Sequence, residues 1–170
     1  MTRFGYVMTA YFTAMAIGVG SLFPPAPRLI WNASASVPVG LYGLHRAGRL
    51  HVGELVAIRP PEPLAGYMAN RRYLPERVFL LKHIQALSGQ TVCRTGAAVT
   101  VDGRAVGEAL ARDRMGRALP VWRGCRVIKR GEVFLMNRTP ADSFDGRYFG
   151  PLPVSAVIGE ATPIWIRRAS

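Results

Sequence analysis

An uncharged, largely apolar run from Phe4 to Phe23 constrains this chain more than any other feature of its sequence. The run follows Arg3 and is long enough to cross a bilayer as a helix. Its Tyr, Thr and Gly residues also suit a cleavable signal peptide, with the small residues 33–35 as a loose cleavage site. We favour a retained anchor, because the run is longer than a usual signal core. Residues 1–23 are thus an N-terminal transmembrane anchor or signal segment, and residues 24–170 form an exported domain.

The charge of the chain excludes few functions by itself. The net charge is +12, from 22 basic and 10 acidic side chains. The basic residues are scattered, and no pattern of a nucleic-acid-binding module appears, so we do not expect nucleic acid as a partner. For a membrane-tethered domain, this charge favours contact with anionic lipid head groups. The three histidines lack metal-ligand spacing, and we expect neither a metal nor a cofactor.

After the Pro-rich segment 24–27, short runs of Val, Ile, Leu and aromatic residues alternate with turn signals. These runs predict strands at residues 39–45, 54–59, 77–84, 90–94, 98–101, 104–106, 126–129, 132–137 and 157–167. Residues 64–73 predict a helix that ends before Pro75, and Asp102-Gly103 predicts a type I′ hairpin turn. Residues 108–120 predict a loop or a short helix. The expected fold class is β-rich, all-β to α+β, in one domain behind an N-terminal helix.

Cys93 and Cys125 are the only cysteines of the chain. Their spacing matches no metal site, and one such pair in an exported domain is typical of a disulfide. Two buried thiols are the alternative.

Lys82 is the most informative single residue, because Lys129 is the only other lysine among 22 basic side chains. On a strand, Lys82 shares a face with the aliphatic residues Val78, Leu80 and Ile84. Burial on such a face lowers a lysine pKa, so that the neutral amine can act as a general base. Arginine cannot take this role, because its guanidinium keeps its proton in proteins. An edge-strand lysine that extends its amine to water is the alternative.

Two small hydroxyl residues, Ser34 and Ser36, follow the apolar run. Pro38 fixes the backbone just after them and Gly40 permits a close approach, so that Ser36 can be held rigidly as a nucleophile for a lysine base. Ser34 lies on the same side if the segment is extended, where its hydroxyl can donate to a developing oxyanion. A solvated spacer is the alternative.

The segment 142–151 brings two acids, a serine and an arginine close together. This composition suits a turn whose charges pair internally. Alternatively, a carboxylate or hydroxyl of this segment orients the amine of Lys82.

Taken in order, these segments resemble the conserved boxes of the type I signal peptidases, the membrane-bound Ser/Lys leader peptidases. The similar segments are Ser34–Pro38, Gly53–Ile58, Leu81–Gln90, Ser143–Pro151 and Val157–Ala161. The pattern Ser-x-Pro-x-Gly-Leu-Tyr at residues 36–42 and the compact size are characteristic of the conjugative-transfer peptidases of TraF type. Gly146 departs from the family, which has a serine there. Ser143 and Asp145 therefore remain as the residues that would position Lys82.

The resemblance implies a signal-peptidase-like β-fold and a membrane-tethered serine endopeptidase of the conjugation (type IV secretion) apparatus. It places the protein in the bacterial inner membrane, in contact with its lipids, with the catalytic domain in the periplasm. Ser36 and Lys82 would form the catalytic dyad, and Ser34 would contribute to the oxyanion hole. The implied substrate is a pilin precursor, bound in extended form and cleaved or cyclised through an acyl-enzyme. Other proteins of the conjugation channel are further candidate partners.

Two other functions stay open. One is a general secretory signal peptidase I, and the other is a non-catalytic, basic envelope scaffold of the transfer channel. A scaffold does not need both Ser36 and Lys82 in a peptidase-like context, which counts against it.

Overall fold

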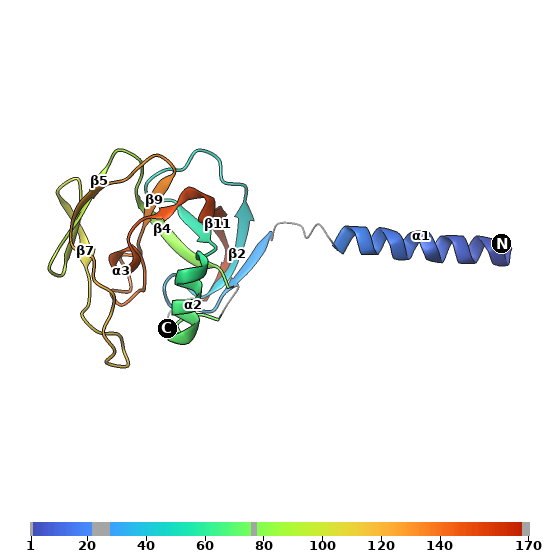
Figure 1. Cartoon of the computed structure of the whole chain (residues 1–170), viewed down its shortest axis with the longest axis horizontal. Coiled ribbons are helices and arrows are strands. Elements are labelled where there is room, and N and C mark those ends of the chain that lie inside the picture. Colours follow the sequence, from blue (N-terminus) through green and yellow to red (C-terminus); the bar gives the residue numbers. More distant parts are fainter. Residues whose placement is uncertain (1, 22–27, 76–77, 168–170) are drawn as a thin grey trace.

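The computed structural model describes residues 2–21, 28–75 and 78–167, and in these residues the chain is β-rich, as predicted (Figure 1). Its strands pair antiparallel in two sheets within the described ranges. The larger sheet has the strand order β1-β2-β11-β3-β4-β9-β10, and the smaller sheet has the order β7-β6-β5-β8.

The elements have the following bounds. The larger sheet consists of β1 (Leu29–Asn32), β2 (Gly40–His45), β3 (Leu55–Ile58), β4 (Leu80–Ala86), β9 (Glu132–Leu135), β10 (Leu152–Pro153) and β11 (Val157–Ile166). The smaller sheet consists of β5 (Thr91–Thr95), β6 (Ala98–Val101), β7 (Arg104–Glu108) and β8 (Gly124–Val127). The helices are α1 (Arg3–Ser21), α2 (Glu62–Asn70) and α3 (Gly146–Phe149), with a 3₁₀ turn at Val154–Ala156.

The predicted strands are confirmed within a few residues at their ends, but two short strands were missed. These are β1 and β10, which lie at the two edges of the larger sheet. The strand predicted over residues 77–84 begins at Leu80 instead. Arg77 lies outside the described residues, and Val78 is 39% exposed, so Val78 does not share the buried face of Lys82.

The local signals of the sequence explain the turns. Asp102 and Gly103 have φ values of 48° and 78°, and both lie in the left-handed region that a type I′ hairpin turn between β6 and β7 requires. Residues 108–120 are mainly a loop, with one isolated β-bridge between Arg112 and Ala118. Helix α2 begins and ends earlier than predicted, because proline is tolerated in its first turn and Arg72 adopts a φ of 56° after its end.

Helix α1 covers the apolar run as far as Ser21, apart from the β-rich body (Figure 1). The end of the run at residues 22–23 and the Pro-rich segment 24–27 lie outside the described residues. No helix in the described part of the chain is both long enough and apolar enough to cross a membrane. The transmembrane anchor expected over residues 1–23 is therefore not confirmed.

Strand β4 lies in the interior of the larger sheet, between β3 and β9. Leu80 and Ile84 pack with α2 in one core cluster, whereas Leu81 packs in another cluster with residues of β1, β2 and β11. Alternate residues of β4 thus face opposite sides of the sheet. A third cluster fills the space between the two sheets, with Phe134 and Met136 packed against strands of the smaller sheet. Lys82 therefore lies on a central strand, and the edge-strand alternative is wrong.

Candidate active site

Ser34 and Ser36 lie on the loop between β1 and β2, where the backbone turns rather than extends. The two hydroxyl oxygens are nevertheless 2.9 Å apart. Gly40 follows at the start of β2, where a Cβ would lie 2.1 Å from the carbonyl oxygen of Trp165. The close approach that Gly40 permits is therefore to β11, and it fixes the end of the serine-bearing loop.

Asn32, the buried last residue of β1, shapes this loop with its side-chain amide. Its Nδ2 donates to the carbonyl oxygens of Ser34 at 2.8 Å and Val37 at 3.0 Å. Its Oδ1 accepts a hydrogen bond from Ser34 Oγ at 2.8 Å. Because an amide oxygen can only accept, the Ser34 hydroxyl donates its hydrogen to Asn32 Oδ1. Ser34 Oγ therefore accepts the hydrogen bond that the Ser36 hydroxyl donates. The Ser36 hydroxyl is thus directed at Ser34 in this structure.

Lys82 lies opposite Val56 in the middle of β4 and is 1% exposed. Its Nζ donates to Ser143 Oγ at 2.5 Å. Burial lowers the pKa of Lys82 from its usual 10.5 to about 8, against the opposing charge of Asp145 and with the help of Arg147. With this pKa about a tenth of the amine is neutral at pH 7, far more than a solvated lysine would provide.

Asp145 does not pair with Lys82 but with Arg147, at 2.9 Å and with both side chains at most 1% exposed. Each oxygen of the carboxylate accepts from the guanidinium, Oδ1 from Nε and Oδ2 from Nη2. Arg147 Nη2 also donates to the carbonyl oxygen of Ser143 at 3.0 Å. Asp145 therefore acts on Lys82 through its charge and through the backbone that carries Ser143, rather than by the direct contact that the sequence suggested.

Asn137 joins the three segments of the site and was not identified from the sequence. Its Nδ2 donates to the carbonyl oxygens of Ser36 at 2.7 Å and Leu81 at 3.0 Å. Its Oδ1 accepts from the backbone N–H of His83 at 3.0 Å, and its own N–H donates to Asp145 Oδ2 at 3.1 Å. Leu81 and His83 flank Lys82. One buried amide thus ties the serine loop to the lysine strand.

Ser34, Ser36 and Ser143 line one pocket of about 360 Å³. Lys82 does not line this pocket, and it connects to it through its hydrogen bond to Ser143. Among the described residues, no hydrogen bond joins the side chains of Lys82 and Ser36 directly. The pocket wall therefore contains three of the five residues selected from the sequence, Ser34, Ser36 and Ser143. Lys82 lies behind Ser143, and Asp145 does not line the pocket either.

The packing of the backbone at Gly146 explains why this position carries a glycine. A Cβ at this position would lie 2.7 Å from both the Leu135 carbonyl oxygen and the Phe134 ring. The serine that the resembled motif carries here would not fit against β9. Ser143 is thus the hydroxyl of this segment that contacts Lys82.

The two cysteines lie away from this pocket, in the smaller sheet. Cys93 of β5 and Cys125 of β8 are directly opposite each other in the strand register and form a disulfide. Neither residue lines the pocket of the serines. The crosslink therefore belongs to the scaffold and not to the candidate chemistry.

Comparisons with known proteins show the family of the chain. Residues 1–166 match the family model described as signal peptidase, peptidase S26. The conjugal transfer protein TraF of Agrobacterium fabrum is 33% identical over 144 residues, which cover 79% of this chain and 80% of that protein.

Two further matches complete the comparison. The probable conjugal transfer protein TraF of Sinorhizobium fredii is 36% identical over 143 residues, 78% of this chain and 74% of that protein. A crystal structure of a signal peptidase I from Enterococcus faecalis gives a TM-score of 0.41 at 16% identity, covering 68% of this chain and 98% of that one. The chain belongs to the signal peptidase family, peptidase S26, and the relatives it matches there are conjugal transfer proteins of the TraF type.

Proposed function

We propose that the chain is a serine endopeptidase of the conjugation apparatus, with Ser36 as the nucleophile and neutral Lys82 as the general base. Its family supports peptidase chemistry, and the names of its relatives support a place in conjugal transfer. The observation that carries the proposal is the state of Lys82, which is 1% exposed and whose pKa is lowered to about 8 by burial. A basic scaffold protein has no use for a lysine held in this costly way.

The proposed first step transfers one proton and forms one bond. The Ser36 hydroxyl turns from Ser34 toward Lys82, Nζ accepts its proton, and Ser36 Oγ attacks the scissile carbonyl carbon. Ser143 accepts an N–H of the amine, as it does in the structure, and so orients the lone pair toward Ser36. The Lys82 ammonium then returns the proton to the leaving amine, which leaves an acyl-enzyme on Ser36.

The proposed oxyanion hole consists of the Ser34 hydroxyl and the backbone N–H of Ser36. In the free protein the Ser34 hydroxyl donates to Asn32 Oδ1, so it must rotate toward the substrate oxygen. Asn32 Nδ2 meanwhile keeps its bond to the Ser34 carbonyl. The loop therefore stays in place while one hydroxyl exchanges its partner.

The proposed substrate is a conjugative pilin precursor, bound in extended form with small residues before the scissile bond. Strand β1 supports this mode of binding, because it is an edge strand of the larger sheet and leads directly into the serine loop. If water resolves the acyl-enzyme, the product is a cleaved pilin. If the amino terminus of the pilin resolves it, the product is a ring. The family and the relatives agree with a site of action at the cell envelope.

The proposal is tested by pilin processing in cells that carry single variants. Ser36→Ala and Lys82→Arg should each lower processing by about 10³-fold or more while the protein still accumulates, because arginine keeps the charge but cannot act as a base. Lys129→Arg is the matched control, since Lys129 is exposed and should process pilin normally. Normal processing by Lys82→Arg would refute the dyad.

The same cells distinguish the substrate and the product. A secreted preprotein expressed beside the pilin should remain unprocessed by this enzyme, and its cleavage would instead indicate a general signal peptidase. Mass spectrometry of the mature pilin separates the two products, because the ring is lighter than the cleaved linear chain by one water.

A further inference from the structure

The pocket of the serines extends beyond them into a basic end. Four arginines line this end, together with two aspartates: Arg71, Arg72, Arg114, Arg117, Asp113 and Asp142. They come from the end of α2, from residues 110–119, which we call the rim loop, and from the segment before Ser143. Guanidinium groups therefore outnumber carboxylates around one end of the pocket.

Asp113 is already saturated by its own loop. Its Oδ2 accepts from Tyr73 Oη at 2.6 Å and Arg117 Nε at 2.8 Å, and its Oδ1 accepts from two backbone N–H groups, those of Met115 and Arg117, at 2.9 Å each. These bonds hold its pKa well below the usual range for aspartate, against the opposing effect of burial. Asp113 thus organises the rim loop and offers no free charge to a ligand.

The rim loop is clamped to the end of α2 by further hydrogen bonds. Arg117 Nη2 donates to the Arg71 carbonyl oxygen at 3.0 Å, and Arg71 Nη1 donates to the Ala118 carbonyl oxygen at 2.7 Å. The guanidinium carbon of Arg71 also lies 4.8 Å from the centre of the Tyr67 ring. Both arginines also pair with Asp113, Arg117 Nε at 2.8 Å and Arg71 Nη1 at 4.0 Å, so that one carboxylate faces two guanidinium groups.

Arg72 and Arg114 are the exposed cations of this end. Arg114 forms an ion pair with Asp142, whereas the side chain of Arg72 has no hydrogen bond or ion pair within residues 2–21, 28–75 and 78–167. Since the two aspartates neutralise at most two of the four guanidinium groups, positive charge remains. The apolar side chains of Leu119 and Phe144 line the pocket beside this charge.

We propose that this basic end binds an acidic segment of the substrate polypeptide that flanks its scissile bond. The inference rests on the proposed function for the position of that bond at Ser36, which lines the same pocket. The carboxylates of such a segment would meet Arg72 and Arg114, and the apolar lining would take its neighbouring side chains. A polypeptide fits better than a phosphate-rich ligand, because Ser34, Ser36 and apolar side chains form the remainder of the wall.

The test measures binding without turnover, so that it does not depend on catalysis. The full chain with Ser36→Ala is titrated into a fluorescent peptide that carries two glutamates beside a run of small residues, and into the same peptide with glutamines. Anisotropy should report binding of the acidic peptide about fivefold tighter at low salt, since exposed ion pairs contribute up to about 1 kcal/mol each. The difference should shrink as salt screens the charges.

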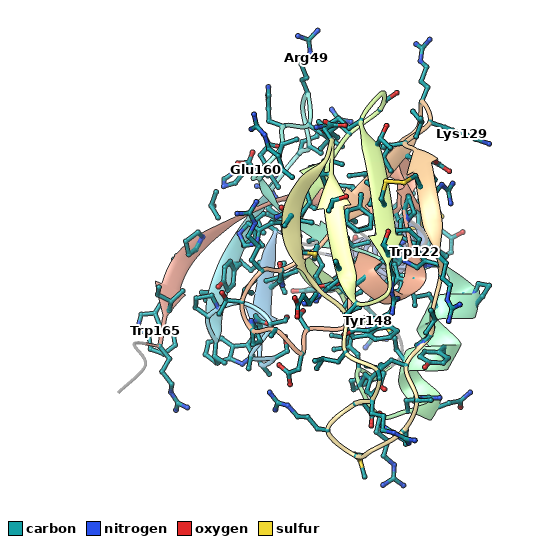
Figure 2. The ribbon with its side chains drawn as sticks, turned by 90° about the vertical axis from the view of Figure 1, so that its left-hand side faces the viewer. Arg49, Trp122, Lys129, Tyr148, Glu160 and Trp165 are labelled. Carbon is teal, nitrogen blue, oxygen red and sulfur yellow. A yellow bond between two sulfur atoms is a disulfide. The ribbon has the colours of Figure 1, made fainter. Side chains whose placement is uncertain are left out.

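Arginine variants test whether the preference for the acidic peptide arises at the basic end of the pocket. Adding Arg72→Gln and Arg114→Gln should remove the preference for the acidic peptide. Arg49→Gln with Arg130→Gln is the matched control, because both side chains are exposed and neither lines the pocket. Figure 2 shows Arg49 at the end of the body away from Tyr148, whose hydroxyl accepts from the rim-loop N–H of Leu110. Equal thermal unfolding of the variants confirms that all are folded.

The possible results test the acidic-segment proposal and the proposed peptidase function separately. Equal binding of both peptides, or an equal loss of preference in the control, would overturn the acidic segment even if the enzyme cleaves pilin. The same variants are also tested for binding to anionic lipid vesicles. If Arg72→Gln with Arg114→Gln weakens vesicle binding but leaves peptide binding unchanged, the acidic segment is overturned in favour of a membrane contact. A clear acidic preference without any peptidase activity would refute the proposed function and keep the binding site.

Discussion

Strand β4 of the larger sheet and β8 of the smaller sheet are both antiparallel strands, but they differ in what they bury. All residues of β8, Gly124–Val127, are exposed, and the strand is crosslinked to β5 through Cys93 and Cys125. Most residues of β4 are buried, and the titratable side chain of Lys82 is among them. Strand β8 is thus exposed and joined to its neighbour by a covalent bond, whereas β4 is buried in a core that includes polar groups.

Burying polar groups is a poor route to stability, because desolvation opposes the interactions gained. The structure concentrates these groups in one place: Lys82, Asn137, Ser143, Asp145 and Arg147 are all at most 5% exposed. Under the proposed function, this buried polar cluster serves the chemistry of Lys82 rather than the stability of the fold.

The two sheets meet at this cluster. Arg94 of β5 donates to the Arg147 carbonyl oxygen at 2.5 Å, and Trp122 Nε1 donates to the Gly146 carbonyl oxygen at 3.0 Å. Figure 2 shows Trp122 and Tyr148 beside the strands of the smaller sheet. The smaller sheet therefore supports α3, the helix that follows Ser143, without contributing a side chain to the candidate dyad.

The largest effect on stability should come from breaking the buried ion pair. Arg147→Met leaves the Asp145 charge buried without its partner, which should cost about 3–5 kcal/mol of unfolding free energy in urea titrations. Arg126→Met on β8 is the matched control, because the Arg126–Glu132 pair is partly exposed and should cost less than about 1 kcal/mol. Equal losses in the two variants would show that the two sheets do not differ in the way described.

The next largest effect should come from removing the crosslink. Cys93→Ser with Cys125→Ser opens a bridge between residues 32 apart in sequence, and should lower the unfolding free energy by about 3–4 kcal/mol. The rate of peptide cleavage should be kept at temperatures where the variant is folded, since neither cysteine lines the pocket.

Alkylation of the wild-type protein provides the companion measurement. Without reductant, neither cysteine should react, and with reductant both should react. Two reactive thiols without reductant would show that the pair is not crosslinked in the cell.

The sequence was sufficient for much of the fold, because strand periodicity and turn residues act locally. The Asp102-Gly103 hairpin and the strand around Lys82 are examples, and the lysine itself was selected because arginine dominates elsewhere. The β1 edge strand was missed because four residues carry too little pattern.

The candidate site was predicted less completely, because its contacts join distant segments. Asn137 is the last residue of the strand predicted over residues 132–137 and gave no signal by itself, although its amide reaches Ser36 across 101 positions. For Asp145, the local composition suggested charge pairing within segment 142–151, and the family resemblance suggested a role in positioning Lys82. The ion pair with Arg147 confirms the first interpretation.

A smaller effect on stability and a measurable one on rate should follow from Asn137→Ala. The variant leaves the Leu81 carbonyl and the His83 N–H without their partner, which should cost about 1–3 kcal/mol. It also frees the Ser36 carbonyl, so that kcat should fall by on the order of 10²-fold through misplacement of the nucleophile.

If Asn137 positions Ser36, its loss should lower kcat alone. The apparent pKa of the rate and the KM for a pilin-derived peptide should change little in Asn137→Ala, since Lys82 stays buried. If kcat is unchanged while stability falls, Asn137 is a structural residue of the larger sheet only.

The central claim is that Lys82 works as a neutral base because it is buried, and the pH dependence of the rate tests it most directly. The measurement is kcat/KM for cleavage of a pilin-derived peptide by the detergent-solubilised protein, with thermal unfolding recorded at each pH. The neutral amine is present above the pKa of Lys82, so the rate should rise with pH and level off above about 8. A rate that stays low and flat until the pH nears the usual lysine value of 10.5, in a protein that remains folded, would contradict the account.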